Sequence, residues 1–333
     1  MLNSPKLFLK NAVKPLEIPT FDGSGQAVHP DIIKIKGKTT RYVLAFTPYP
    51  FSNELYEKPS VLVSRDGISW LENDIKNPVI SSKSGKELAS DPDIVYARGK
   101  FYLYFVSQIW GGKLFKKARA LFKQYTKQYS SSVKVVVSKD LKKWSKPIQI
   151  LKSGGLSSFW PFTRLIICPS VTWDGIFKMW YIKAFGCTNT NPRLYYRESK
   201  DGISWGKEKR VFIQFPKGQV IWHIDVEKLS NGQYWMLIAA YPKSEHCEKI
   251  KNLYLAVSND GLSWKTREKP ILTIDPGSSW DSDSLYRSTF IVENKIFKLW
   301  YTGSRNKIWK IGYTFSKISS LDEKTHSLNV INI

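Results

Sequence analysis

The 333-residue sequence predicts an all-β chain folded as a five-bladed β-propeller with four-stranded antiparallel blades. A short β-prone opening recurs five times, and each copy leads into an aromatic-rich second run. A turn marker that ends in tryptophan follows each of the first four copies. Repetition of one supersecondary unit at a period of about 60 residues indicates a repeat architecture, and five all-β units predict a closed ring.

The five strand openings share one register. They read His29-Pro30-Asp31-Ile32, Asp91-Pro92-Asp93-Ile94, Cys168-Pro169-Ser170-Val171, His223-Ile224-Asp225-Val226 and Tyr286-Arg287-Ser288-Thr289. Three of them have an aspartate at the third position, although aspartate is depleted in strands. Closing the ring is expected to bring these three carboxylates together near one axis.

The turn marker reads Ser64–Trp70, Ser138–Trp144, Ser199–Trp205 and Ser258–Trp264. Three copies contain Asp-Gly between β-prone runs, a strong hairpin signal because glycine accepts the positive φ of a tight turn. We therefore expect the aspartates and tryptophans of the marker to be structural.

We expect one domain over 1–333, with blades near 27–80, 90–151, 165–214, 222–274 and 284–333. Short outer strands are expected at 78–80, 147–150, 210–213 and 270–273. The last blade lacks an obvious one, so the segment 14–19 is expected to supply its fourth strand and close the ring. The segment 328–331 is the competing candidate.

An insertion at 111–131 lengthens the second repeat. Apolar residues recur on one face over 113–129 and lysines occupy much of the rest, so we expect a basic amphipathic helix. Such a helix can lie in the headgroup region of an anionic membrane, with Leu114, Lys117, Leu121 and Phe122 as contacts. The alternative is a helix packed on blade two.

The chain carries 51 Lys and Arg against 28 Asp and Glu, a net charge of +23. Such an excess attracts anionic partners, and the alternative is a set of solvated lysines. We expect no nucleic-acid partner, because the aromatic residues follow the blade period and form no single stacking platform. No long apolar run, signal-peptide core or cysteine framework is present in the sequence, so a cytoplasmic protein, peripheral on the inner membrane face, is expected.

The candidate catalytic carboxylates are Asp31, Asp93 and Asp225, with Glu227 as an alternative acid. Glycoside hydrolysis commonly uses two carboxyl groups, one protonated to assist the leaving oxygen and one ionised. A buried cluster of like charges would separate their pKa values as that chemistry requires. The structural alternative is that Asp-Pro pairs mark turns.

Residues beside these carboxylates are candidates for binding substrate. Histidine and aspartate can hold sugar hydroxyls, tryptophan and tyrosine can stack on sugar rings, and arginine can pair with an acidic group. The candidates are His29, Asp91, Trp222, His223, Trp280, Asp283, Tyr286 and Arg287. We expect no cofactor and no metal site.

The openings His29-Pro30-Asp31 and Ser90-Asp91-Pro92-Asp93, with the five repeats, resemble the five-bladed β-propeller glycosidases of the family 43 and family 32 clan. The resemblance implies a general base or nucleophile at Asp31 and a positioning, pKa-tuning carboxylate at Asp93. The family's acid is a glutamate, and none occupies a matched position here, which leaves Asp225 or Glu227. The turn marker is also similar to the Asp-box of sialidases, although those have six blades.

The resemblance implies a glycoside hydrolase. The excess positive charge and the expected basic helix lead us to expect an anionic or lipid-linked envelope polysaccharide as its substrate. Two alternatives stay open. One is a catalytically inactive propeller that binds glycan or scaffolds polysaccharide assembly, and the other is a glycoside phosphorylase that uses a basic phosphate site.

Overall fold

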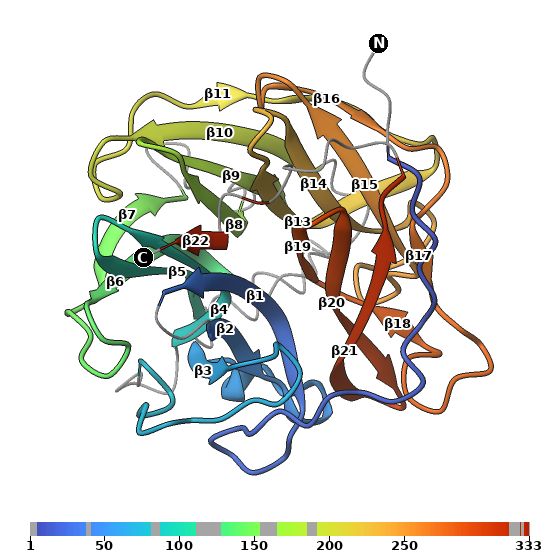
Figure 1. Ribbon diagram of the computed structural model, residues 1–333, viewed down its shortest axis with the longest axis horizontal. Coiled ribbons are helices and arrows are strands. Elements are labelled where there is room, and N and C mark those ends of the chain that lie inside the picture. The colour runs from blue at the N-terminus through green and yellow to red at the C-terminus, as the bar shows by residue number, and fades with distance from the viewer. Residues whose placement is uncertain are drawn as a thin grey trace, which may run out of the picture.

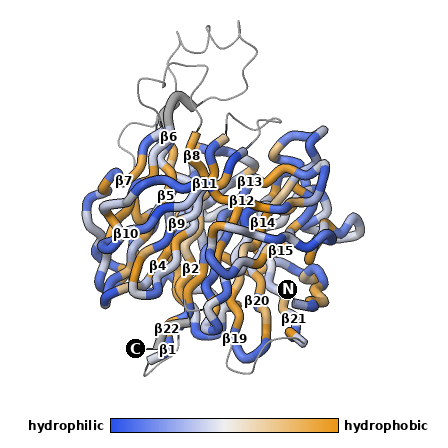
Figure 2. Tube along the Cα trace, turned by 90° about the horizontal axis from the view of Figure 1, so that it is seen from above, coloured by the Kyte–Doolittle hydropathy of each residue, from blue (hydrophilic) through white to orange (hydrophobic). Residues whose placement is uncertain are grey.

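The computed structural model describes residues 5–37, 41–80, 87–110, 128–153, 165–184, 192–319, 327 and 330–332. Five mainly antiparallel sheets stand around a central axis, which confirms the all-β five-bladed propeller (Figure 1). In the side view, hydrophobic stretches run along the strands in the body of the propeller (Figure 2).

The first three blades follow one another along the chain. Blade one contains β1 (Ala27–Lys36), β2 (Arg41–Pro48) and β3 (Ser60–Ser64). Blade two contains β4 (Glu87–Ala97), β5 (Lys100–Trp110), β6 (Gln128–Ser138) and β7 (Ile148–Lys152). Blade three contains β8 (Leu165–Trp173), β9 (Phe177–Ala184), β10 (Arg193–Ser199) and β11 (Lys209–Arg210).

The last two blades depart from the simple four-strand pattern. Blade four contains β12 (Phe212–Gln214), β13 (Gln219–Lys228), β14 (Tyr234–Pro242), β15 (Asn252–Ser258), β16 (Ser263–Thr266) and β17 (Leu272–Thr273). Blade five contains β18 (Ser284–Leu285), β19 (Thr289–Glu293), β20 (Ile296–Arg305) and β21 (Ile308–Lys317). Its inner strand is thus divided into β18 and β19, which both pair with β20.

Two expected outer strands differ from the structure. The strand expected at 210–213 divides, because Arg210 pairs with β10 in blade three while Phe212 pairs in parallel with β16 of blade four. No strand forms at 78–80, where only the Val79 N–H bonds to the Pro59 carbonyl among the described backbone contacts. Short outer strands have few ladder bonds, so local turns decide which blade they join.

The two ends of the chain lie against different blades. The Leu16 N–H donates to the Ile311 carbonyl on β21 at 2.8 Å. At the other end, β22 (Val330–Asn332) pairs in parallel with β1 of blade one. Between blades five and one, the Glu293 carboxylate lies 2.6 Å from Lys34 Nζ and 2.9 Å from Lys36 Nζ.

The helix expected over 113–129 lies outside the described residues, apart from Gln128 and Tyr129, which belong to β6. The proposed membrane contacts Leu114, Lys117, Leu121 and Phe122 also lie outside them. The described residues contain only two short 3-10 helices, η1 (Pro50–Ser52) and η2 (Glu54–Tyr56). Among them, no helix is long and apolar enough to cross a membrane.

The turn markers are structural, as predicted. In the first marker the Asp66 carboxylate accepts the N–H groups of Ile68 and Ser69, both at 2.8 Å. The marker glycine meets the second strand of the preceding blade: Trp300 Nε1 donates to the Gly67 carbonyl at 2.7 Å. A Cβ on Gly67 would lie 2.9 Å from the Trp300 ring, and its φ is +79°, so glycine is required there.

Candidate active site

The inner strands bulge at the openings identified in the sequence. Register shifts lie between Val28 and Asp31 in β1, between Ser90 and Asp93 in β4, and between Ile167 and Ser170 in β8. The residue before each proline has a left-handed backbone, with φ values of 56°, 50° and 52° at His29, Asp91 and Cys168. Bulges and strained non-glycine residues re-aim side chains and cluster at functional sites.

The register shows which residues are equivalent after each bulge. Asp31 lies opposite Ala45, the fourth residue of the aromatic-rich run 42–46. Asp93 lies opposite Tyr104, the fourth residue of the run 101–105. In blade five the residue in that place is Thr289, opposite Trp300. The sequence alignment on Ser288 was therefore wrong by one residue, because blade five has its irregularity at 287–288 and the sequence does not show it.

With this register, two sets of five side chains come from the inner strands. We call the set at the register position the second layer: Asp31, Asp93, Ser170, Asp225 and Thr289. The set two residues earlier is the first layer: His29, Asp91, Cys168, His223 and Arg287. All ten residues are buried.

The second layer joins each blade to the next. Asp31 Oδ2 accepts the Ile94 N–H, and Asp93 Oδ2 accepts the Val171 N–H at 3.0 Å. Ser170 Oγ accepts the Val226 N–H at 2.8 Å. Asp225 Oδ2 accepts the Phe290 N–H at 3.3 Å, and the Thr289 hydroxyl donates to Asp31 Oδ1 at 3.5 Å. These side chains satisfy buried backbone groups of the neighbouring blade, which is a structural role.

The three second-layer carboxylates also shift one another's pKa values through their charges. Burial and the nearby Asp31 carboxylate raise the pKa of Asp93 and of Asp225 well above its usual value. Arg287, which is fully buried, donates to Asp93 Oδ1 at 3.2 Å and opposes these shifts. A buried carboxylate cluster with one guanidinium favours partial protonation over full ionisation.

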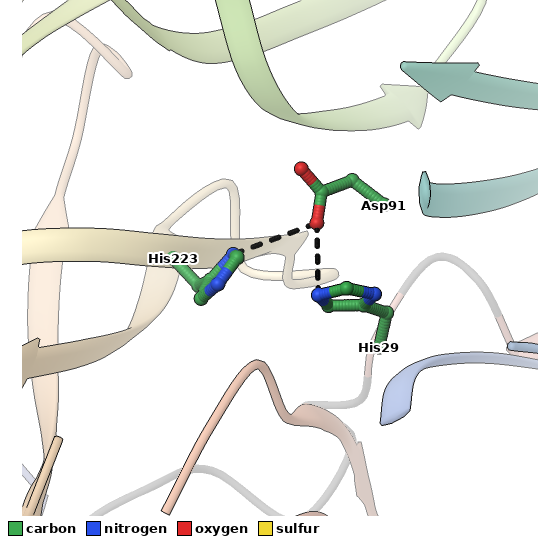
Figure 3. Close-up of side chains that lie close together, drawn as sticks. All are labelled: His29, Asp91 and His223. Atoms are coloured by element: carbon green, nitrogen blue, oxygen red, sulfur yellow. Dashed lines mark ion pairs between the residues drawn. The ribbon is translucent and has the colours of Figure 1, made fainter. Parts of the chain in front are cut away.

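In the first layer, His29, Asp91 and His223 converge from three different blades (Figure 3). His29 Nε2 lies 3.2 Å from Asp91 Oδ1, and His223 Nδ1 lies 3.6 Å from the same oxygen. One ligand-type atom from each residue lies within 4.8 Å of the others. The three side chains are 2–3% exposed.

The converging atoms lack hydrogen bonds among the described residues. His29 Nε2, Asp91 Oδ1 and both ring nitrogens of His223 are buried without a hydrogen-bond partner there. His29 Nδ1 and the Thr47 hydroxyl are 2.9 Å apart, which fixes the ring and directs Nε2 toward Asp91. Buried polar groups without partners are costly, so their convergence indicates a ligand.

The titration of these groups suits a metal ion. Burial lowers the pKa of His29 to about 4 and that of His223 well below its usual value, so both rings are neutral. Burial acts to raise the pKa of Asp91, but His29, His223 and Arg287 outweigh it and lower that pKa. Two neutral imidazoles and one carboxylate are a ligand set for Zn²⁺, Mn²⁺ or Fe²⁺ that leaves coordination positions open.

Glu57 adds a second carboxyl group beside this set. It follows η2 in the loop between β2 and β3, and its Oε1 lies 3.8 Å from His29 Nδ1. Burial, with the charges of Asp91 and Glu54, raises the pKa of Glu57 well above its usual value. A buried carboxyl with a raised pKa is suited to accept and return a proton near neutral pH.

Aromatic rings surround the histidines. The Tyr286 ring centroid lies 4.3 Å from that of His223 and 5.2 Å from that of His29. The Trp222 and His223 rings lie edge to face, with their centroids 6.1 Å apart. The structure therefore brings six predicted substrate-binding residues to this region: His29, Asp91, Trp222, His223, Tyr286 and Arg287.

Three other predicted site residues lie elsewhere. Trp280 packs on Tyr301 and donates from Nε1 to the Ala12 carbonyl at 2.9 Å, under the N-terminal segment. Asp283 is exposed and accepts the Asn306 N–H. Glu227 is buried two residues beyond Asp225 on β13, opposite Trp235.

Sequence reasoning missed Glu57, Thr47 and the convergence of His29, Asp91 and His223. Glu57 and Thr47 have no counterpart in the repeat pattern, so no periodic signal marked them. The signal for this convergence was present in the sequence: His29 and His223 each precede an aspartate by two residues, and Asp91 holds the matching place in β4.

Comparison with known proteins supports the fold. No family model matches the sequence. The chain is 24% identical over 350 aligned residues to an A type blood N-acetyl-α-D-galactosamine deacetylase of Flavonifractor plautii, covering 86% of this chain and 44% of that protein. An uncharacterised protein of Mycobacterium tuberculosis is 30% identical over 141 residues, which cover 39% of this chain and 43% of that one. The chain thus spans less than half the length of either relative.

Solved structures agree with the resemblance to propeller glycosidases. The crystal structure of an N-acetylgalactosamine deacetylase from F. plautii superposes with a TM-score of 0.75 at 21% identity, over 92% of this chain and 95% of that chain. A thermostable family-43 glycoside hydrolase superposes with a TM-score of 0.62 at 14% identity, over 94% and 97% of the two chains. At these identities the likeness concerns the fold.

Proposed function

We propose that this protein is a metal-dependent hydrolase that removes the N-acetyl group of an amino sugar within a glycan. The observation that carries the proposal is the convergence of His29, Asp91 and His223, whose facing ring and carboxylate atoms are buried without hydrogen-bond partners among the described residues. The F. plautii relative, a deacetylase by name, supports the choice of an acetamide over a glycosidic bond.

A divalent ion held by these three residues would polarise the acetamide carbonyl and lower the pKa of a water molecule. Asp91 supplies the negative charge of the site, and His29 and His223 supply neutral nitrogen ligands. Thr47 orients the His29 ring through Nδ1.

Glu57 is the proton carrier in this proposal. Its carboxylate takes a proton from the water whose oxygen attacks the acetyl carbon, and the carboxyl then gives that proton to the amine nitrogen. One C–O bond forms and the amide C–N bond breaks, so that acetate and a free amino sugar leave. Burial and the charges of Asp91 and Glu54 raise the pKa of Glu57 well above its usual value, which supports its role as the group that takes up the proton.

A glycosidase that uses the second-layer carboxylates is the second candidate. Its support is the convergence of Asp31, Asp93 and Asp225 within 4.8 Å and their raised pKa values. Against it, each carboxylate accepts a backbone N–H of the next blade, and Asp93 also pairs with Arg287. The excess positive charge of +23 supports an anionic glycan as substrate in either case.

The test measures acetate release and reducing-end release from N-acetylhexosamine-containing oligosaccharides, with acidic polysaccharides in a second panel. Wild type is compared with Asp91→Asn, Glu57→Gln and Asp31→Asn, before and after chelation and readdition of Mn²⁺ or Zn²⁺. We expect acetate release that is lost on chelation and in the Asp91 and Glu57 variants. Reducing ends without acetate, insensitive to chelation and lost in Asp31→Asn, would establish the glycosidase instead.

A further inference from the structure

The loop between β2 and β3 exposes large apolar side chains directly before Glu57. Phe51 is 65% exposed, Leu55 48% and Tyr56 39%, whereas Glu57 is buried. Three exposed apolar residues within six positions are more than scattered surface residues require, and such patches mark binding surfaces.

The loop holds Phe51 outward at a conformational cost. Phe51 has φ 51° and ψ 36°, and Ser52 has φ 62°, a left-handed conformation that bulky residues rarely adopt. Gln26 Oε1 accepts the N–H of Phe51 at 3.0 Å, and Ser52 Oγ accepts Trp309 Nε1 at 2.9 Å. A strained backbone that is fixed by neighbours and exposes an aromatic ring indicates a functional role for that ring.

A chain of aromatic contacts links this loop to the candidate metal ligands. Trp309, bonded to Ser52, lies 5.3 Å from the Tyr286 ring, and Tyr286 lies 4.3 Å from the His223 ring. Two ring contacts therefore separate the loop from His223. We infer that a sugar ring bound over Phe51 would be a different ring from the one whose acetamide reaches His223, because Trp309 and Tyr286 lie between Ser52 and His223.

We propose that Phe51 and Tyr56 form a subsite for the pyranose ring adjacent to the N-acetylated sugar. The proposal rests on the proposed function and deepens it, because it assigns a binding site to the sugar next to the one that is deacetylated. The C–H face of a pyranose is apolar and packs on an aromatic face, while its hydroxyl groups stay in water. Leu55, next to Tyr56 in the chain, is also exposed.

The test compares two substrates in wild type, Phe51→Ala and Tyr56→Ala. One is a methyl N-acetylhexosaminide and the other a disaccharide that carries the same N-acetylhexosamine. Loss of one aromatic contact is expected to raise KM for the disaccharide about 2- to 12-fold with kcat unchanged. The KM for the monosaccharide should stay constant. Phe51→Trp should retain the wild-type preference.

Phe315→Ala is the matched control, because Phe315 is also an exposed aromatic residue, 57% exposed on β21. If Phe51→Ala and Tyr56→Ala change KM equally for both substrates, or for neither, the proposed subsite is wrong. If wild type releases no acetate, the proposed function fails, and calorimetric titration with the disaccharide then decides the subsite separately. Binding that weakens in Phe51→Ala but not in Phe315→Ala would support it, and no difference would reject it.

Discussion

The Thr289 hydroxyl donates to Oδ1 of Asp31 across 3.5 Å, so the inner strand of blade five is bonded to that of blade one. The other second-layer side chains join blades one to five in the same manner, through backbone N–H groups. The propeller thus uses polar side chains near its axis to join blades whose described inner strands form no ladder with one another. The recurring aspartates therefore have a structural explanation. In the first layer, Asp91 Oδ2 likewise accepts the Cys168 N–H at 3.0 Å, and the proposed ligand site rests on Asp91 Oδ1 with His29 and His223.

Replacing Asp93 by alanine is expected to destabilise the fold by about 3–5 kcal/mol, because breaking a buried ion pair leaves its partner charge unpaired. Arg287 would lose its carboxylate partner and the Val171 N–H its acceptor. Urea denaturation at pH 7 measures the effect, with Asp93→Asn expected to lose less. Glu72→Ala, on an exposed residue, is the control, and an Asp93→Ala variant as stable as this control would contradict the structural role.

The ion cluster of Glu293 predicts a pH-dependent stability. Burial acts to raise the pKa of Glu293, but bonds from Lys34 and Lys36 and the charge of Lys298 outweigh burial and lower it to about 2. A carboxyl whose folded-state pKa is depressed stabilises the fold above its unfolded pKa of about 4.5, and this stabilisation is lost as pH falls toward about 2.

Glu293→Gln should therefore lower the free energy of unfolding by about 2 kcal/mol at pH 7, allowing for solvent screening of a partly hydrated group. The difference in free energy of unfolding between the variant and the wild type should begin to shrink as pH falls below about 4.5. Urea unfolding of both proteins at pH 7, 5, 4 and 3 checks the window. A difference that stays constant over this range would show that Glu293 acts through packing alone.

Removal of metal is expected to lower the melting temperature of the wild-type protein by a few degrees. A ligand that binds only the folded state at 100 times its Kd adds about 2.7 kcal/mol to stability. Thermal melts with Mn²⁺, Zn²⁺ or excess chelator measure the shift. His223→Gln should abolish it, whereas His246→Gln, on a half-buried histidine outside the first layer, should preserve it. A shift that survives in His223→Gln would place the ion elsewhere.

The sequence predicted the repeat architecture because strand openings, aromatic runs and turn markers follow local rules that each blade satisfies separately. The same repeat predicted the convergence of Asp31, Asp93 and Asp225. The register expected from the repeat was wrong in blade five, where the bulge at Arg287 and Ser288 shifts the matching position to Thr289. A bulge inserts one residue without a composition signal, so the register after it depends on tertiary pairing.

Residues outside the repeat were not predictable in this way. Glu57 reaches His29 from the loop between β2 and β3, which has no counterpart in the repeat. Trp280 was misassigned because it is near Tyr286 in sequence, yet it packs under the N-terminal segment against Tyr301. Sequence proximity does not show on which side of a strand a loop residue lies.

Thr47 tests whether the His29 ring is held for metal binding. Thr47 is fully buried on β2, and its hydroxyl and His29 Nδ1 are 2.9 Å apart. Thr47→Val keeps the shape but removes the hydroxyl, so metal affinity is expected to fall about 10- to 100-fold, as on loss of other groups that orient metal-ligating histidines. Thr47→Ser should restore affinity. Titration of Mn²⁺ or Zn²⁺ into each apo-protein measures the Kd, and urea denaturation of the same samples measures stability. A Thr47→Val protein that loses stability but binds metal with wild-type affinity would show that Thr47 supports packing and does not orient His29.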